Sequence, residues 1–60
     1  MAFTQMYEQL PPDNIPLNIV VSFYPGIVLE ATYDNLNDVF IVTASGLVIQ
    51  AQFIYEWEVI

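Results

Sequence analysis

The stretch LVIQAQFIYEWE, residues 47–58, determines the predicted fold class, because apolar and polar side chains alternate along most of it. The side chains expected on its apolar face are Leu47, Ile49, Ala51, Phe53, Tyr55 and Trp57. The polar side chains expected on the opposite face are Gln50, Gln52, Glu56 and Glu58, with Val48 and Ile54 as exceptions. Alternation with a period of two residues indicates a half-buried β-strand, so this stretch predicts one long strand.

Three segments upstream also have strand character, and they lie near residues 17–24, 27–33 and 39–44. Apolar side chains alternate along the first two, whereas the third begins with a continuous apolar run, typical of a strand buried on both faces. Ser45-Gly46 is a turn signal of the kind that joins hairpin strands. Because the links are short, we expect an all-β fold, namely an antiparallel four-stranded meander or a minimal barrel.

The link at Pro25-Gly26 is the weakest point of that prediction. A Pro-Gly pair favours type I or type II turns, whose twist fits a two-residue hairpin poorly. We therefore expect this connection to be longer than two residues, or the strands that flank it to lie in different sheets.

Residues 1–16 differ in character from the β domain that we predict over residues 17–60. Three prolines lie within residues 11–16 and favour an extended, polyproline-like path with few backbone donors. We therefore expect residues 1–16 to form an extended, Pro-rich N-terminal arm.

The first part of this arm has apolar residues at the spacing of one helical stripe. These residues are Phe3, Met6, Tyr7 and Leu10. An isolated helix this short is only marginally stable in water. We therefore expect the arm to become ordered only by laying Phe3, Tyr7 and Leu10 on another surface.

The composition excludes several classes of function, because the 60 residues include no Lys, Arg, His or Cys. Seven acidic residues give a formal net charge of −7. Since Lys and Arg supply the affinity for phosphates and anionic lipids, we expect no nucleic-acid partner and no membrane-surface partner. The common catalytic bases and nucleophiles are absent as well, so we expect no enzyme activity. We likewise expect no cofactor, no disulfide and no thiolate or imidazole metal site.

The chain carries no obvious targeting or membrane-spanning segment. Residues 1–14 lack the basic and apolar regions of a secretory signal, so we expect none, which is compatible with a virion or cytoplasmic location. Residues 39–55 are uncharged, but polar side chains interrupt them and no basic flank sets an orientation. We therefore do not expect a transmembrane helix.

The segment at residues 34–38 has two carboxylates and two amides, and leaves two interpretations open. Oxygen ligands of this kind suit calcium, although Leu36 and the missing glycine depart from the pattern of an EF-hand loop. The alternative is a polar hairpin loop without a ligand.

A sheet of this size is expected to keep apolar side chains on both faces, and nine aromatic residues are many for one small core. A single domain of 60 residues buries only about 60% of the surface of its unfolded chain, so its core is marginal. An exposed apolar face marks an interaction site. The candidate partner-binding residues are Phe3, Tyr7, Leu10, Tyr24, Phe40, Trp57, Glu56 and Glu58.

Two hypotheses of function follow from these features. The first is a non-enzymatic structural or assembly protein, a small acidic β subunit that forms a homo-oligomer or docks on a larger protein scaffold. A virion accessory or decoration protein fits this architecture by analogy alone. The second is an acidic inhibitor that occupies the basic groove of a nucleic-acid-binding protein, although its acidic residues form no dense run.

Overall fold

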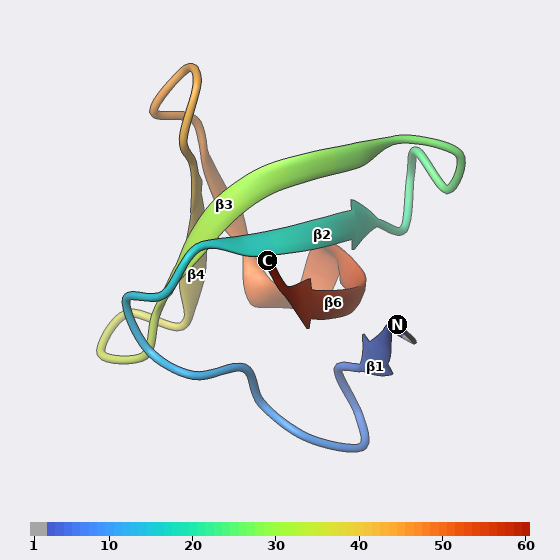
Figure 1. Cartoon of the computed structure of the whole chain (residues 1–60), viewed down its shortest axis with the longest axis horizontal. Coiled ribbons are helices and arrows are strands. Elements are labelled where there is room, and N and C mark those ends of the chain that lie inside the picture. Colours follow the sequence, from blue (N-terminus) through green and yellow to red (C-terminus); the bar gives the residue numbers. More distant parts are fainter. Residues whose placement is uncertain (1–2) are drawn as a thin grey trace.

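The computed structural model describes residues 3–60, which form a single antiparallel β-sheet (Figure 1). Its strands are β1 (Thr4–Gln5), β2 (Leu17–Val21), β3 (Val28–Asp34), β4 (Val39–Val42), β5 (Val48–Gln50) and β6 (Ile54–Val59). A short 3₁₀ helix, η1 (Ala51–Phe53), joins β5 to β6. The predicted all-β class is confirmed.

The order of strands across the sheet is β1-β6-β2-β3-β4-β5, and every neighbouring pair is antiparallel. Strands β2 to β5 follow one another as a meander, but β6 returns to pair with β2 rather than with β5. The predicted four-stranded meander or minimal barrel is therefore not confirmed, because six strands form one open sheet. The sheet is nonetheless strongly bent, since its extents are 23 × 21 × 21 Å and β3 curves visibly in Figure 1.

The core lies on the concave side of this bend. Leu17 and Ile19 on β2 are fully buried, and their antiparallel partners across the sheet share the same face. The other large side chains that are fully buried are Val21, Tyr33 and Phe40. Because every strand from β2 to β6 contributes to one cluster, the bend is what lets a single sheet enclose its own core.

The prediction of one strand over residues 47–58 is wrong, because η1 interrupts it. The alternation of buried side chains changes phase there: Ile49 and Ala51 are buried, and the next buried residue is Ile54. Phe53 and Tyr55, which the alternation placed on the apolar face, are exposed instead. A turn of 3₁₀ helix advances the chain without the two-residue period of a strand, so residues on either side of η1 cannot share one pattern.

The N-terminal segment lies against the sheet, and the extended arm that the sequence predicts is not confirmed. Thr4 pairs with Trp57 of β6, and the Met6 N–H donates to the Tyr55 carbonyl at 3.2 Å. The Trp57 indole Nε1–H donates to the Gln9 carbonyl at 2.9 Å, and Pro11 is buried. Among the described residues of this segment the helical stripe forms no helix, because strand pairing and these anchors outweigh a marginal local propensity.

The connection between β2 and β3 runs over residues 22–27 and is longer than two residues, which agrees with the poor fit of Pro25-Gly26 to a tight hairpin. The Tyr24 N–H donates to the Val21 carbonyl, and the Ile27 N–H donates to the Tyr24 carbonyl, both at 3.1 Å. Two successive turns therefore replace one tight turn, and they hold the aromatic residues of this link outside the core.

Candidate protein-binding surface

Three exposed aromatic rings form a compact cluster at one end of the sheet, which we call the aromatic corner: Phe23, Tyr24 and Phe53. The Phe23 ring centroid lies 5.6 Å from that of Tyr24 and 5.9 Å from that of Phe53, both in edge-to-face geometry. The rings remain 56%, 58% and 42% exposed, respectively. Aromatic pairs at this separation attract one another, so the cluster is held in a defined arrangement while still facing solvent.

Backbone contacts fix the aromatic corner to the sheet. The Ser22 N–H donates to the Phe53 carbonyl at 2.7 Å, and the Ser22 hydroxyl donates to the same carbonyl at 3.1 Å. This carbonyl belongs to η1, so η1 and the link between β2 and β3 are joined directly. A surface that is already ordered loses less entropy when a partner covers it, which favours binding.

Acidic side chains occupy the outer face of the central strands. Asn18 on β2 pairs with Glu30 on β3 and with Glu58 on β6, which places the two carboxylates on either side of Asn18. Glu56 lies in the adjoining row, where it pairs with Val20. The backbones of Glu30 and Glu58 are two strand spacings apart, or about 10 Å, so the carboxylates form one negative patch. One carboxylate oxygen of Glu58, Oε1, is shielded from solvent and has no hydrogen-bond partner among the described residues.

The acidic loop between β3 and β4 uses its carboxylates for internal hydrogen bonds. Asp34 Oδ2 accepts from the Asn37 side-chain amide at 2.8 Å, and Asp34 Oδ1 accepts from the Leu36 N–H at 3.1 Å. These bonds, with that of the Asn37 side chain as the largest contribution, lower the pKa of Asp34 from its usual value. Within residues 3–60 no cluster of three or more acidic side chains is arranged to hold a metal ion. The hydrogen bonds of Asp34 thus order this loop as a turn.

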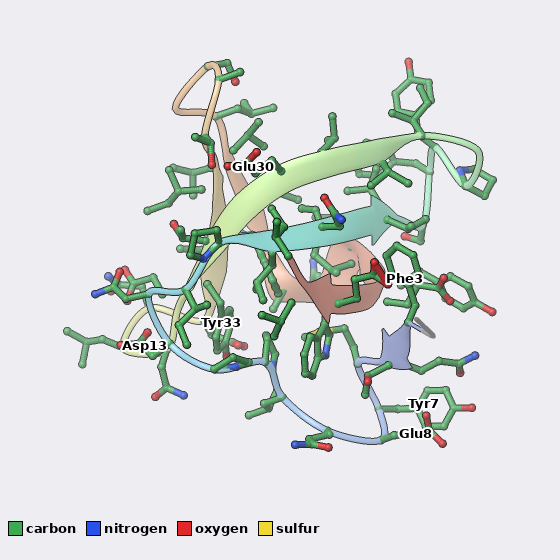
Figure 2. The ribbon with its side chains drawn as sticks, in the orientation of Figure 1. Phe3, Tyr7, Glu8, Asp13, Glu30 and Tyr33 are labelled. Atoms are coloured by element: carbon green, nitrogen blue, oxygen red, sulfur yellow. The ribbon has the colours of Figure 1, made fainter. Side chains whose placement is uncertain are left out.

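Tyr33 links this loop to the core. Its hydroxyl donates to Asp38 Oδ1 at 2.6 Å, while its ring packs on Phe40 with the centroids 4.8 Å apart. The hydrogen bond to Asp38, together with burial of the tyrosine, raises the pKa of Tyr33 to about 12. Figure 2 shows Tyr33 and Asp13 at the same end of the sheet, where Asp13 Oδ1 accepts from the Asn35 N–H at 2.8 Å.

A shallow polar cleft of about 240 Å³ opens beside this loop and the end of β5. Its lining residues are Asn37, Asp38, Val39, Gln50, Ala51 and Gln52. The lining contains no arrangement of an acid with a nucleophile, since its titratable side chain is Asp38, which already accepts the Tyr33 hydroxyl. The cleft thus supplies hydrogen-bonding groups at the edge of the sheet.

The candidate partner-binding residues fall into three groups in the structure. Phe40 and Trp57 lie in the core, Tyr24 belongs to the aromatic corner, and Glu56 and Glu58 lie half-buried on the acidic outer face. The remaining three come from the N-terminal segment: Phe3, Tyr7 and Leu10. Tyr7 and Leu10 are exposed and Phe3 is partly buried; Figure 2 shows Tyr7 pointing away from the sheet at the turn after β1.

Phe23 and Phe53 were not among the candidate residues, although both are exposed in the structure. A local signal existed for Phe23, since it lies just before the turn residues Pro25-Gly26. No local signal marks η1, which has neither glycine nor proline. The contact between these two rings depends on a tertiary pairing that no sequence pattern contains.

Comparisons with known proteins add no family to this description. No protein-family model matches the chain, and neither a curated protein nor a solved structure is significantly similar to it. Among residues 3–60 no helix is long and apolar enough to cross a membrane.

Proposed function

We propose that this chain is a non-enzymatic assembly protein, a small acidic β subunit that forms a homo-oligomer or docks on a larger protein scaffold. The observation that carries the proposal is the aromatic corner, an ordered and exposed cluster of three rings on a domain of 60 residues. Buried aromatic residues dominate the energetics of many protein interfaces. A virion accessory or decoration protein is the structural class that we consider closest, by analogy of architecture.

The number of exposed apolar side chains also supports this proposal. Further exposed apolar side chains on β3, β6 and the link before β3 include Ile27, Val28 and Tyr55. A contiguous exposed patch of several hundred Å² is typical of an interaction site in a soluble protein. A domain this small also gains stability from association, because its own core is marginal.

Light scattering of the purified chain at several concentrations tests the proposal. A mass of two to five protomers is expected, because the exposed aromatic and aliphatic side chains become buried on association. A single protomer at every concentration, with a cooperative thermal transition, would contradict it.

A substitution in the aromatic corner provides a more local test. Phe23→Ser removes the ring that contacts both Tyr24 and Phe53, and Leu36→Ser is the matched control, because Leu36 is 91% exposed and lies on a different loop. We expect the first variant to weaken association or scaffold binding, and the second to leave it unchanged. If the two variants associate or bind the scaffold equally well, the aromatic corner takes no part in assembly.

The alternative is an acidic inhibitor that occupies a basic groove, and the observation that favours it is the patch of Glu30, Glu56 and Glu58 on the outer face. A contact made by these carboxylates depends strongly on ionic strength, because salt screens exposed charges beyond about 10 Å at 0.1 M. A contact made by the aromatic corner changes little with salt. Binding to a basic protein that disappears between low and high salt would favour the inhibitor.

A further inference from the structure

The two edges of the sheet differ in how their backbone groups are used. At the β1 edge the Met6 N–H turns inward to the Tyr55 carbonyl, so the neighbouring Gln5 turns its C=O outward. This outward C=O is used within the chain, since it accepts from the Glu8 N–H at 2.9 Å and the Gln9 N–H at 3.3 Å. The outward C=O of the β1 edge is therefore taken up by its own turn.

The β5 edge has no such closure. The Val42 N–H donates to the Leu47 carbonyl at 2.8 Å, and the Ala51 N–H donates to the Asp38 carbonyl at 3.2 Å. Residues 47 and 51 thus direct their backbone toward β4, and alternate residues of an antiparallel strand direct theirs away. Within residues 3–60 no hydrogen bond uses the outward groups of Val48 or the outward N–H of Gln50.

The β5 edge also lacks the features that usually prevent edge pairing. Native edge strands carry charges, prolines or bulges that stop another strand from adding. Residues 39–55 contain no charged residue and no proline, and no bulge marks the pairing of β5 with β4. Leu47 and Val48, moreover, are 58% and 57% exposed.

We propose that β5 pairs with β5 of a second copy of this chain, antiparallel across a two-fold axis at Ile49. In this arrangement the Gln50 N–H of each copy donates to the Val48 carbonyl of the other, and the two sheets become continuous. This inference rests on the proposed assembly function and names one contact within it.

The lack of charge at the β5 edge suits an occupant whose own strand is uncharged, and β5 of a second copy is such a strand. Every charged side chain is acidic, so two copies that meet through the outer face would bring Glu30, Glu56 and Glu58 against like charges with no cation to offset them. The β5 edge is uncharged on both sides of the proposed axis. The antiparallel arrangement also places the two Asp38 carboxylates, each of which lies beside the Gln50 end of β5, at opposite ends of the contact.

The backbone geometry of Gln50 provides a direct test. Gln50 has φ −66° and ψ 143°, which proline adopts without strain, and its N–H is not used within the chain. Gln50→Pro therefore removes a donor from the edge at no cost in internal hydrogen bonds. Gln50→Ala is the matched control, because it removes the side chain and keeps the N–H.

Sedimentation equilibrium of the full chain and the two variants measures the effect. We expect a dimer for the native chain and for Gln50→Ala, and a dissociation constant raised about tenfold or more for Gln50→Pro, because two donors are lost per dimer. Dimerisation of a folded Gln50→Pro as tight as that of the native chain overturns the β5 contact alone. A native chain that remains a folded monomer overturns the contact and the proposed homo-oligomer together.

A second variant keeps the test valid if the proline variant does not fold. Val48→Glu adds a carboxylate to the edge of each copy, and the proposed pairing brings the two within about 10 Å, where repulsion is not fully screened. We expect a folded Val48→Glu that associates more weakly than the native chain. Unchanged association of this variant overturns the proposal.

Discussion

The two edges of this sheet are built from strands of similar length and yet behave differently. The β1 edge is covered by the segment that follows it: the turn at Glu8 takes up the Gln5 carbonyl, and the Trp57 indole anchors the Gln9 carbonyl. The β5 edge lies between a hairpin turn and η1, and within residues 3–60 no hydrogen bond uses its outward Gln50 N–H. The comparison shows that a short chain can close one edge with its own N-terminal segment and leave the other edge for a partner.

The two edges also differ in composition. Glu8 and the paired Glu56 lie beside β1, whereas residues 39–55 are uncharged. Charge near an edge opposes the addition of another strand. The net charge of −7 is therefore unevenly distributed, and it opposes strand addition less at β5 than at β1. The β5 side is the place where a second copy can approach.

The largest expected effect is beside the β1 edge, at Trp57 of β6, which pairs with Thr4. Trp57→Ala removes a buried indole that packs in the core and donates to Gln9, which costs about 3–5 kcal/mol. A single small core supplies about as much stability in total. We expect the variant to be unfolded by circular dichroism at 25 °C.

Trp57→Phe is the control, since it retains an aromatic ring and loses the indole donor. We expect it to fold with a free energy of unfolding lower by about 1–3 kcal/mol. A Trp57→Ala variant that melts at the native temperature would show that the N-terminal segment is not anchored at this position.

The next largest effect on stability is expected at Tyr33. The N-terminal segment is also tied to the sheet here, because the Asn14 N–H donates to the Tyr33 carbonyl at 3.0 Å. Tyr33→Phe removes the hydroxyl that donates to Asp38, at an expected cost of about 1–2 kcal/mol. Urea unfolding measures the change. Leu36→Asn, on the same loop and exposed, should alter stability by less than about 0.5 kcal/mol. Equal losses in the two variants would contradict a role for the hydroxyl.

The same hydroxyl predicts a dependence of stability on pH. The pKa of Tyr33 is about 12 in the folded chain, raised mainly by the hydrogen bond to Asp38, whereas an unfolded tyrosine has a pKa of about 10. The folded state therefore holds a proton that the unfolded state releases between these values. The contribution is fully present below pH 10 and is lost as the pH rises toward 12. We expect Tyr33→Phe to lose less stability than the native chain between pH 10 and pH 12. Equal losses in the two chains would show that the Tyr33 hydroxyl is not the source of the pH dependence.

The smallest effect is expected on the open edge, at Val48. Val48→Thr keeps a β-branched side chain on an exposed position, so the free energy of unfolding of the monomer should change by less than about 0.5 kcal/mol. Thermal unfolding at low protein concentration measures it. A loss of more than 1 kcal/mol would mean that the β5 edge is covered within the monomer.

The sequence was sufficient to predict the all-β class, and strands β2, β3 and β4 lie within or close to the predicted segments. Alternating side chains indicate such strands from local sequence alone, whichever strand pairs with them. Residues 47–58 were mispredicted because η1 lacks glycine and proline and because its flanks keep apolar residues at nearly regular spacing. The pairing of β1 with β6 was not predictable either, since it joins residues more than 50 positions apart.

The candidate surface was predictable only in part. Tyr24 and the pair Glu56 and Glu58 are on the surface, whereas Phe40 is fully buried because β4 lies between β3 and β5. A continuous apolar run does not reveal which of its faces is covered. The aromatic corner depends on the turns after β2 and on η1, and both arise from tertiary packing.

Amide hydrogen exchange of the native chain, resolved by residue and measured at low and high protein concentration, tests the difference between the edges most directly. At low concentration the Val48 and Gln50 amides should exchange at nearly the rate of an unfolded chain, while the Met6 amide, which is bonded to Tyr55, should be protected. At high concentration the Gln50 amide should become protected as the copies pair, with Met6 unchanged. Strong protection of Val48 and Gln50 that is independent of concentration would contradict an edge left open for a second copy.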